Sequence, residues 1–299
     1  MSHEWKLSDM EQEFYIYIAR IGSADTLYPL KALELTVESC QGILDEFLSN
    51  FKNILEAVSV PFHVGMFTAS MSQVKLTEKL LNKAKDEGCK DSFSVATYLM
   101  NNKSYTAGIE SVIPSFQKLE SHGILSAQFE TLYKLAAIRF YGCLEELSKQ
   151  VLKLIVTSDI SCLDILSAKD IRIGKSKCET LKARILQSQQ ELSITIGQAY
   201  DEEILNKGYS LEQYSKIFNE LIGANFSAES IDSIKQLESS RHLFVHRSSI
   251  IDQKYIDETG CNQNLGEILK LPASYMYEWQ NSLILYAKEL ILKASVKCS

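Results

Sequence analysis

Apolar residues recur at every third or fourth position along most of this chain, the spacing that places them on one face of an α-helix. In the first third, the pattern predicts a helix from Leu27 to Val58 that is stopped by Pro61. Two shorter helices are predicted from Ser72 to Ala84 and from Ser92 to Met100. No repeat or chemical motif precedes residue 118, so this part of the sequence predicts helices and no activity.

The pattern is clearest from about residue 124 onward, where a long amphipathic helix is predicted. Its apolar positions follow one another at steps of three or four: Phe129, Leu132, Ala136, Phe140, Cys143, Leu147, Val151 and Leu154. A second helix is expected from about Glu179 to Ala199. A third is expected from Leu211 to Ile222, with Gly223 at its C-terminal end.

Two more helices complete the predicted C-terminal half. Ser227 is a suitable N-cap for the first of them, and Glu229 would favour the helix dipole in its first turn. Pro272 marks the start of the last helix. The apolar positions of that helix include Met276, Trp279, Leu283, Tyr286, Leu290 and Ile291. Long helices with short links are typical of an up-and-down bundle, so we predict an all-α fold with an N-terminal helical region at 1–118 and a helical domain at 119–299.

Composition agrees with long helices in an ordered protein. The 299 residues include only 4 prolines and 13 glycines, and 45% of them are hydrophobic and 23% charged. The N-terminal sequence is charged and lacks the apolar core of a signal peptide. No apolar run reaches the roughly 18 residues that a membrane helix needs. We therefore expect a soluble, cytoplasmic protein with no membrane partner.

The cysteines predict neither a zinc site nor a disulfide framework. They are odd in number, widely spaced and without any Cys-x-x-Cys pair, so we expect free thiols. The seven are Cys40, Cys89, Cys143, Cys162, Cys178, Cys261 and Cys298.

The net charge of −7 argues against a protein that coats nucleic acid through bulk electrostatics. A local basic groove remains compatible with it, because residues 169–184 contain six basic side chains against two acidic ones. Lys175 and Lys177 in this stretch, together with Arg247 and Lys254, are candidate RNA contacts. A solvated helix face is the simpler interpretation of the basic stretch.

The residues best suited to chemistry lie between Glu238 and Arg247, a segment that holds two of the five histidines and two arginines. An imidazole can take the proton from a ribose 2′-OH because its pKa lies near neutrality. A guanidinium matches the oxygens of a phosphate whose charge grows during cleavage. Arg241 and His246 could fill these two roles and cut RNA without a metal. They are five positions apart, about 140° around an ideal helix, and would converge best if the helix ended or distorted near His246.

Zinc binding is a second interpretation of this segment. His242 and His246 are spaced as two zinc ligands on one helix face, but no third ligand has a recognisable spacing, so no metal or other cofactor is predicted. On spacing alone, a helix end with two surface histidines would be favoured. Gly174-Lys175-Ser176 lacks the remainder of a P-loop, and Ser248 and Ser249 lack a nucleophile elbow.

The segment from Arg241 to His246 resembles the motif of HEPN ribonucleases, in which a histidine follows an arginine after four to six residues and a polar residue comes directly after the arginine. The sequence from Ile251 to Ile256, followed by a final apolar helix, is similar to HEPN C-terminal halves. Residues Leu135 to Glu145 resemble the first HEPN helix, which often carries an acidic residue that faces the site. The resemblance covers roughly residues 120–299.

The resemblance implies a role for each matching residue. Arg241 would bind the scissile phosphate, His246 would act as acid or base, and His242 would orient one of them. Glu145 would be the acidic residue of the first helix, with Glu146 as the alternative register. The products implied are a 2′,3′-cyclic phosphate and a 5′-hydroxyl.

The resemblance also implies partners and a setting. HEPN ribonucleases resemble one another in cutting RNA as symmetric dimers with a composite active site. Their setting suggests a toxin or an antiphage, abortive-infection effector, restrained by an antitoxin or a sensor protein. Two alternatives stay open: a non-catalytic HEPN-type module that binds RNA or protein, and a plain helical scaffold.

Overall fold

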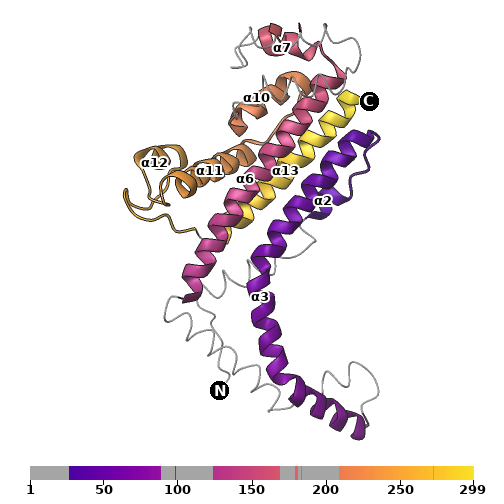
Figure 1. The fold of residues 1–299 in the computed structure, drawn as a ribbon, viewed down its shortest axis with the longest axis vertical. Helices are drawn as coiled ribbons and strands as arrows, with labels where there is room; N and C mark the ends of the chain where they lie inside the picture. The colour runs from indigo at the N-terminus through magenta and orange to yellow at the C-terminus, as the bar shows by residue number, and fades with distance from the viewer. Residues whose placement is uncertain are drawn as a thin grey trace. The chain divides into compact units, whose positions relative to one another are not determined.

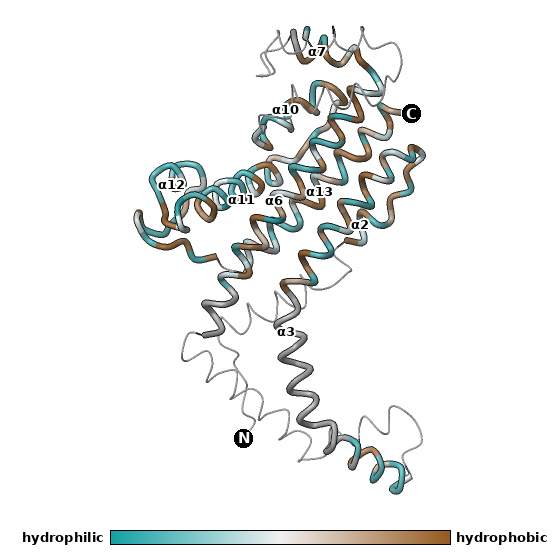
Figure 2. Tube along the Cα trace, in the orientation of Figure 1, coloured by the Kyte–Doolittle hydropathy of each residue, from teal (hydrophilic) through white to brown (hydrophobic). Residues whose placement is uncertain are grey.

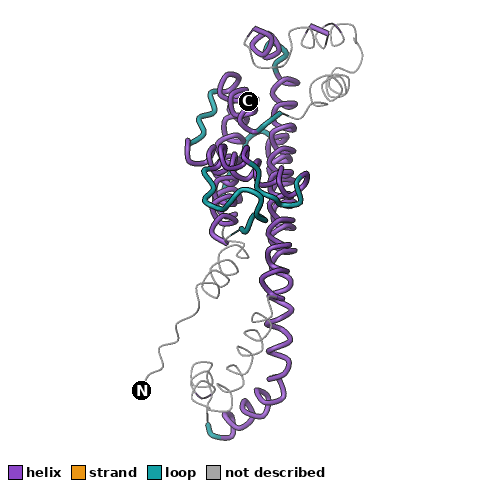
Figure 3. Tube along the Cα trace, turned by 90° about the vertical axis from the view of Figure 1, so that its left-hand side faces the viewer, coloured by secondary structure: helices purple, strands orange, loops and turns teal. Residues whose placement is uncertain are grey.

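The computed structural model describes residues 27–88, 98, 124–168, 179–180, 183, 209–271 and 273–299. These residues contain no β-strand, and one isolated antiparallel bridge pairs Ile250 with Ile268 (Figure 3). The fold is therefore all-α, as the periodicity predicted. Within the described ranges, none of the helices combines the length and the apolar character required to cross a bilayer.

The described helices keep a simple order along the chain (Figure 1). They are α2 (Tyr28–Lys31), α3 (Glu38–Asp86), α6 (Ile124–Ser158), α7 (Cys162–Ala168), α10 (Leu211–Ile222), α11 (Ala228–His246), α12 (Gln253–Thr259) and α13 (Ala273–Cys298).

The described chain forms two compact units. Residues up to Leu55 and those from Tyr133 onward make up the first unit, and Glu56–Leu132 make up the second. The first unit thus combines the start of α3 with most of the C-terminal helices. The boundary predicted between 118 and 119 lies outside the described residues.

The core of the first unit is built from the apolar faces of its helices. All six apolar positions predicted for the last helix are buried, and Trp279 at its centre is fully enclosed. Figure 2 shows hydrophobic and hydrophilic turns alternating along α6 and α13, as expected for helices with one buried face. The Trp279 Nε1–H also donates to Gln236 Oε1 at 3.2 Å, which joins α13 to α11.

The first part of α3 packs along α6 within the same unit. The rings of Phe51 and Phe140 stack with their centroids 4.7 Å apart. At the periphery, Gln150 Nε2 donates to Glu46 Oε2 at 3.0 Å. Ring stacking of this kind adds to the apolar area that the two helices bury, so residues before 55 contribute directly to the core that holds α6.

The prediction of one helix from Leu27 to Val58 was wrong at both ends. The short α2 ends at Lys31, non-helical residues follow, and α3 begins only at Glu38. At the other end, α3 continues through Pro61 to Asp86. A proline inside a helix removes one backbone hydrogen bond and its ring clashes with the carbonyl four residues earlier, so α3 continues through Pro61 against the local preference of this residue. The helix predicted from Ser72 to Ala84 is confirmed as part of this long α3.

The predictions for Ser92–Met100 and Glu179–Ala199 fall almost entirely outside the described residues. Tyr98 is helical, and so are residues 179, 180 and 183.

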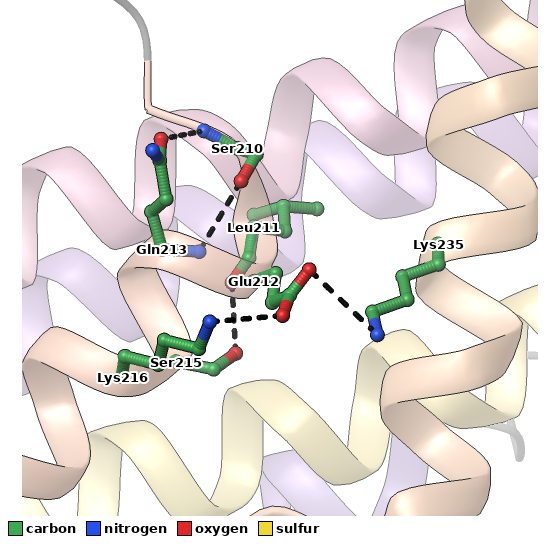
Figure 4. A network of polar contacts seen from close by, with 7 residues as sticks. All are labelled: Ser210, Leu211, Glu212, Gln213, Ser215, Lys216 and Lys235. Carbon is green, nitrogen blue, oxygen red and sulfur yellow. Dashed lines mark hydrogen bonds and ion pairs between the residues drawn. The ribbon is translucent and has the colours of Figure 1, made fainter.

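Local capping explains why α10 begins and ends, and why α11 begins, where the sequence predicted. Ser210 and Gln213 form a reciprocal capping box at the start of α10, with the Gln213 N–H donating to Ser210 Oγ at 3.3 Å (Figure 4). Gly223 ends this helix with a φ of 64°, in the left-handed region that suits glycine. Ser227 caps α11 by accepting from the Ser230 N–H at 3.1 Å. The two helices are linked by Lys235, whose Nζ lies 3.7 Å from Glu212 Oε2.

The short helix α12 was not predicted from periodicity. Asp252 caps it by accepting from the Tyr255 N–H at 2.8 Å, and Gly260 ends it with a φ of 65°. Tyr255 is its buried anchor, with its hydroxyl 3.0 Å from Ser240 Oγ on α11. A helix of seven residues is too short to show a periodic stripe, so its cap residues were the available signal.

Candidate functional site

The segment singled out from the sequence forms the C-terminal part of α11, which packs against α10, α12 and α13. The helix ends at His246, and the Arg247 N–H closes its last turn by donating to the Leu243 carbonyl at 3.0 Å. Ser248 and Ser249 then adopt left-handed backbone conformations, with φ of 51° and 66°. Such values are uncommon for residues other than glycine and turn the chain sharply directly after the histidine.

Arg241 lies on the inner side of this helix end, against α6. Its guanidinium carbon is 4.7 Å from the centroid of the Tyr141 ring, within the range of a cation–π contact. Its Nε atom is shielded from solvent and has no hydrogen-bond partner. No carboxylate in the described part of the chain forms an ion pair with Arg241.

Glu238, one helical turn before Arg241, completes this cluster. The Tyr141 hydroxyl donates to Glu238 Oε1 at 2.9 Å, which ties α6 to α11. Burial raises the pKa of Glu238, and hydrogen bonds from Tyr141 and the Leu211 backbone, together with the nearby charge of Arg241, oppose that rise. Burial also raises the pKa of Tyr141, followed by the effect of Glu238, so the phenol keeps its proton and acts as a donor.

Sequence reasoning missed the roles of Tyr141 and Glu238. Glu238 stands three positions before Arg241, a spacing that places two residues on the same face of a helix. Tyr141 lies within the stretch that resembles the first HEPN helix. The spacing of Glu238 was therefore an available signal, whereas the contact with Tyr141 depends on how α6 and α11 pack.

His242 and His246 lie on a different face of the same helix. Both side chains are exposed, and their ring centroids are 5.1 Å apart. Because α11 stays helical through His246, Arg241 and His246 remain about 140° apart around its axis. The structure thus brings the two histidines together and, within one chain, does not bring Arg241 and His246 together.

Of the two acidic residues considered on α6, Glu145 lies nearer to the cluster. Its charge raises the pKa of Tyr141, one turn before it, while its Oε1 pairs with Lys149 Nζ at 2.8 Å. Glu146 is exposed and accepts a hydrogen bond from Gln150 at 3.2 Å. Glu145 is therefore close enough to Tyr141 for its charge to act on the phenol.

The predicted RNA contacts are placed only in part. The Arg247 side chain is 62% exposed, with its Nε 3.8 Å from Asp252 Oδ2. The Lys254 side chain is 67% exposed, with its Nζ 3.7 Å from Glu258 Oε1. Both cations are accessible beside the helix end. Lys175 and Lys177 lie outside the described residues.

The described ranges contain no cluster of side chains suited to binding a metal ion. There, no group of three or more histidine, cysteine, aspartate or glutamate side chains could hold a metal ion. The cysteines that are described have free thiols: Cys40, Cys143, Cys162, Cys261 and Cys298. Cys89 and Cys178 are outside the described part of the chain.

Comparison with known proteins gives no match: no family model, no curated protein and no solved structure is significantly similar to the chain. The resemblance to HEPN ribonucleases therefore rests on the sequence itself, from α6 to the last helix.

Proposed function

We propose that the protein is a metal-independent endoribonuclease of the HEPN type. The observation that supports this proposal best is the set of contacts made by the Arg241 guanidinium. Its guanidinium is held against an aromatic ring without an ion pair to a described carboxylate, and two exposed histidines lie on the same helix end. A guanidinium whose N–H groups are not paired with a carboxylate has donors available to bind a phosphate.

In the proposed reaction, His246 takes the proton from a ribose 2′-OH, or gives one to the leaving 5′-oxygen. Arg241 binds the phosphate and stabilises the charge that develops on it. His242, one turn before His246, orients the phosphate or the second imidazole. The bond from phosphorus to the 5′-oxygen breaks as the 2′-oxygen bonds to phosphorus. The products are a 2′,3′-cyclic phosphate and a 5′-hydroxyl, and no cofactor takes part.

The complete site is proposed to form between two copies of the chain. The face of α11 that carries Arg241 and the face that carries His246 point in different directions, so one copy does not assemble both groups. In a symmetric dimer, each copy would present the same helix end to a shared cleft. Glu145, Arg247 and Lys254 would border that cleft, and the helical domain would be an up-and-down, HEPN-like bundle.

The proposed setting is a cytoplasmic toxin or antiphage effector whose activity is restrained until it is needed. An antitoxin or a sensor protein would provide the restraint. This setting comes from the family resemblance, whereas the residues support the chemistry.

A second candidate is a non-catalytic module that binds RNA or protein. The separation of Arg241 from His246 around α11 favours it, because a binding surface does not require the two groups to meet. Binding of RNA without cleavage, by a protein shown to be folded and dimeric, would identify this alternative.

The test is cleavage of total RNA by the purified protein in excess EDTA. His246→Ala and Arg241→Ala should each lower the rate by about 10²- to 10⁴-fold, because each removes a group that acts on the reacting atoms. Arg139→Ala, at an exposed arginine of α6, is the matched control and should cleave like the wild type. Cyclic phosphate ends on the products would identify 2′-OH attack. An unchanged rate in the purified, folded His246→Ala variant would reject the assignment.

A further inference from the structure

We propose that Tyr141 and Glu238 are positioning residues, which hold Arg241 so that its terminal nitrogens meet a phosphate. The inference rests on the proposed function for the identity of the ligand. The arrangement itself rests on contacts between α6 and α11, and we call these three residues the arginine clamp.

The first part of the clamp is the ring of Tyr141. It comes from a helix distant in sequence, and its face lies 4.7 Å from the guanidinium carbon of Arg241. An arginine side chain loses rotamer freedom when it is ordered, which opposes binding. A ring already packed in the core supplies a fixed surface for the cation, and Tyr141 is buried. Part of the ordering is therefore complete before a ligand arrives.

The second part of the clamp is the carboxylate of Glu238, which is hydrogen-bonded to Tyr141 and not to Arg241. This carboxylate accepts a hydrogen bond from the Tyr141 hydroxyl at 2.9 Å, and the ion pairs among the described residues include none between Glu238 and Arg241. The charge of Arg241 still lowers the pKa of Glu238, so the two groups attract one another. A direct bidentate pair would occupy the N–H fork that a phosphate needs. The clamp instead attracts the cation while leaving its terminal donors without a carboxylate partner.

The third part is the buried Nε of Arg241. This atom has no hydrogen-bond partner and is shielded from solvent, so it is not a donor that a ligand can reach. The terminal nitrogens are then the atoms through which Arg241 would bind a phosphate. Tyr141 and Glu238 determine where those atoms lie and do not themselves touch the substrate.

Burying Glu238 in the clamp lowers the stability of the folded protein. A residue with only a structural role would not be expected to lower it. Burial raises the pKa of Glu238, which means that folding disfavours its ionised form. The protonated Glu238 carboxyl contributes fully to the free energy of unfolding at pH values below the pKa it has in the unfolded chain. This contribution is lost as the pH rises through its higher pKa in the folded protein. A neutral glutamine would avoid this loss. Glu238→Gln should therefore keep or raise the free energy of unfolding at pH 8, relative to the wild type, while it lowers activity.

The experiment compares Tyr141→Phe and Glu238→Gln with Tyr214→Phe. Tyr214 is a matched control because its ring is buried in the same unit and its hydroxyl has no hydrogen-bond partner. The two clamp variants should lower kcat by up to about 100-fold, the order expected when a catalytic group is misplaced by about 1 Å. KM should change little, and Tyr214→Phe should leave kcat unchanged.

A second measurement follows the clamp without RNA. The Nε–H of Arg241, assigned by its loss in Arg241→Lys, should exchange slowly with solvent in the wild type and faster in Tyr141→Leu, which removes the ring that the guanidinium contacts. If both clamp variants cleave like the wild type while Arg241→Ala is inactive, the clamp is wrong and the ribonuclease proposal stands. If the wild type cleaves no RNA, the ribonuclease proposal fails. The exchange rates alone then show whether Tyr141 holds Arg241 in place. Equal exchange in the wild type and in a folded Tyr141→Leu variant would overturn the clamp.

Discussion

The two faces of α11 near its C-terminus differ in solvent exposure and in their contacts with other helices. On the inner face, Arg241 and Glu238 interact with a buried tyrosine from α6. On the outer face, His242 and His246 are exposed and have each other as ring neighbours. One helix thus presents a cation fixed by tertiary packing and, a turn away, two imidazoles open to solvent.

This difference indicates a division of tasks. A phosphate-binding cation benefits from a fixed position, because disorder in its side chain would have to be removed on binding. A proton-transfer group must reach its substrate and exchange protons with water, which exposure permits. The contrast between the faces can be tested by substitutions whose effects on stability should fall in a definite order.

The largest effect is expected at the apolar residue that anchors the helix end. Leu243 is buried, whereas Val245, two positions away, is 47% exposed. Leu243→Ala should lower the free energy of unfolding by about 2–5 kcal/mol, because it removes packed methyl groups and leaves a cavity. Val245→Ala should change it by less than about 0.5 kcal/mol. Urea unfolding followed by circular dichroism measures both, and similar losses would show that the two faces do not differ in burial.

An intermediate effect is expected at the inner arginine. Arg241→Ala should lower the free energy of unfolding by about 1–3 kcal/mol, because it removes the cation beside the half-buried carboxylate of Glu238. Arg247→Ala, at the exposed arginine just beyond the helix, should change it by less than about 0.5 kcal/mol. The same urea titrations apply. Equal losses in the two variants would contradict the asymmetry between the faces.

The smallest effect is expected at the histidines. His242→Ala and His246→Ala should each alter the free energy of unfolding by less than about 0.5 kcal/mol, since both side chains are exposed. His246→Ala should nevertheless lower the rate of RNA cleavage strongly. A destabilisation above about 1.5 kcal/mol for either variant would show that the outer face has a structural role that its exposure does not indicate.

Much of the fold could be predicted from the sequence because its signals are local. The bounds of α10 follow from the amphipathic pattern and Gly223, and the start of α11 follows from Ser227. The apolar stripe of α13 was confirmed position by position. A local signal misled at Pro61, where α3 continues through a residue that commonly ends a helix.

The candidate site was less predictable. The motif residues of α11 could be identified from spacing, and the neighbourhood of Glu145 could be guessed from resemblance. The bond between Tyr141 and Glu238 could not, because it joins residues 97 positions apart and depends on how two helices pack. The separation of Arg241 from His246 depends on the last turn of α11 staying helical, which the polar residues after His246 did not reveal.

The sharp turn after His246 has a consequence for the order of folding. Ser249 accepts a backbone hydrogen bond from Leu269, and Ile251 donates one to Glu267, both at 2.9 Å or less. These bonds close a loop of about twenty residues, and the entropic cost of closure rises only slowly with loop length. The inner face of the same helix requires α6 to dock from about a hundred residues earlier in the chain. Contacts of low sequence separation form readily, whereas distant ones slow folding. The end of the helix that holds the histidines can therefore close locally, before the arginine has the neighbours that fix it.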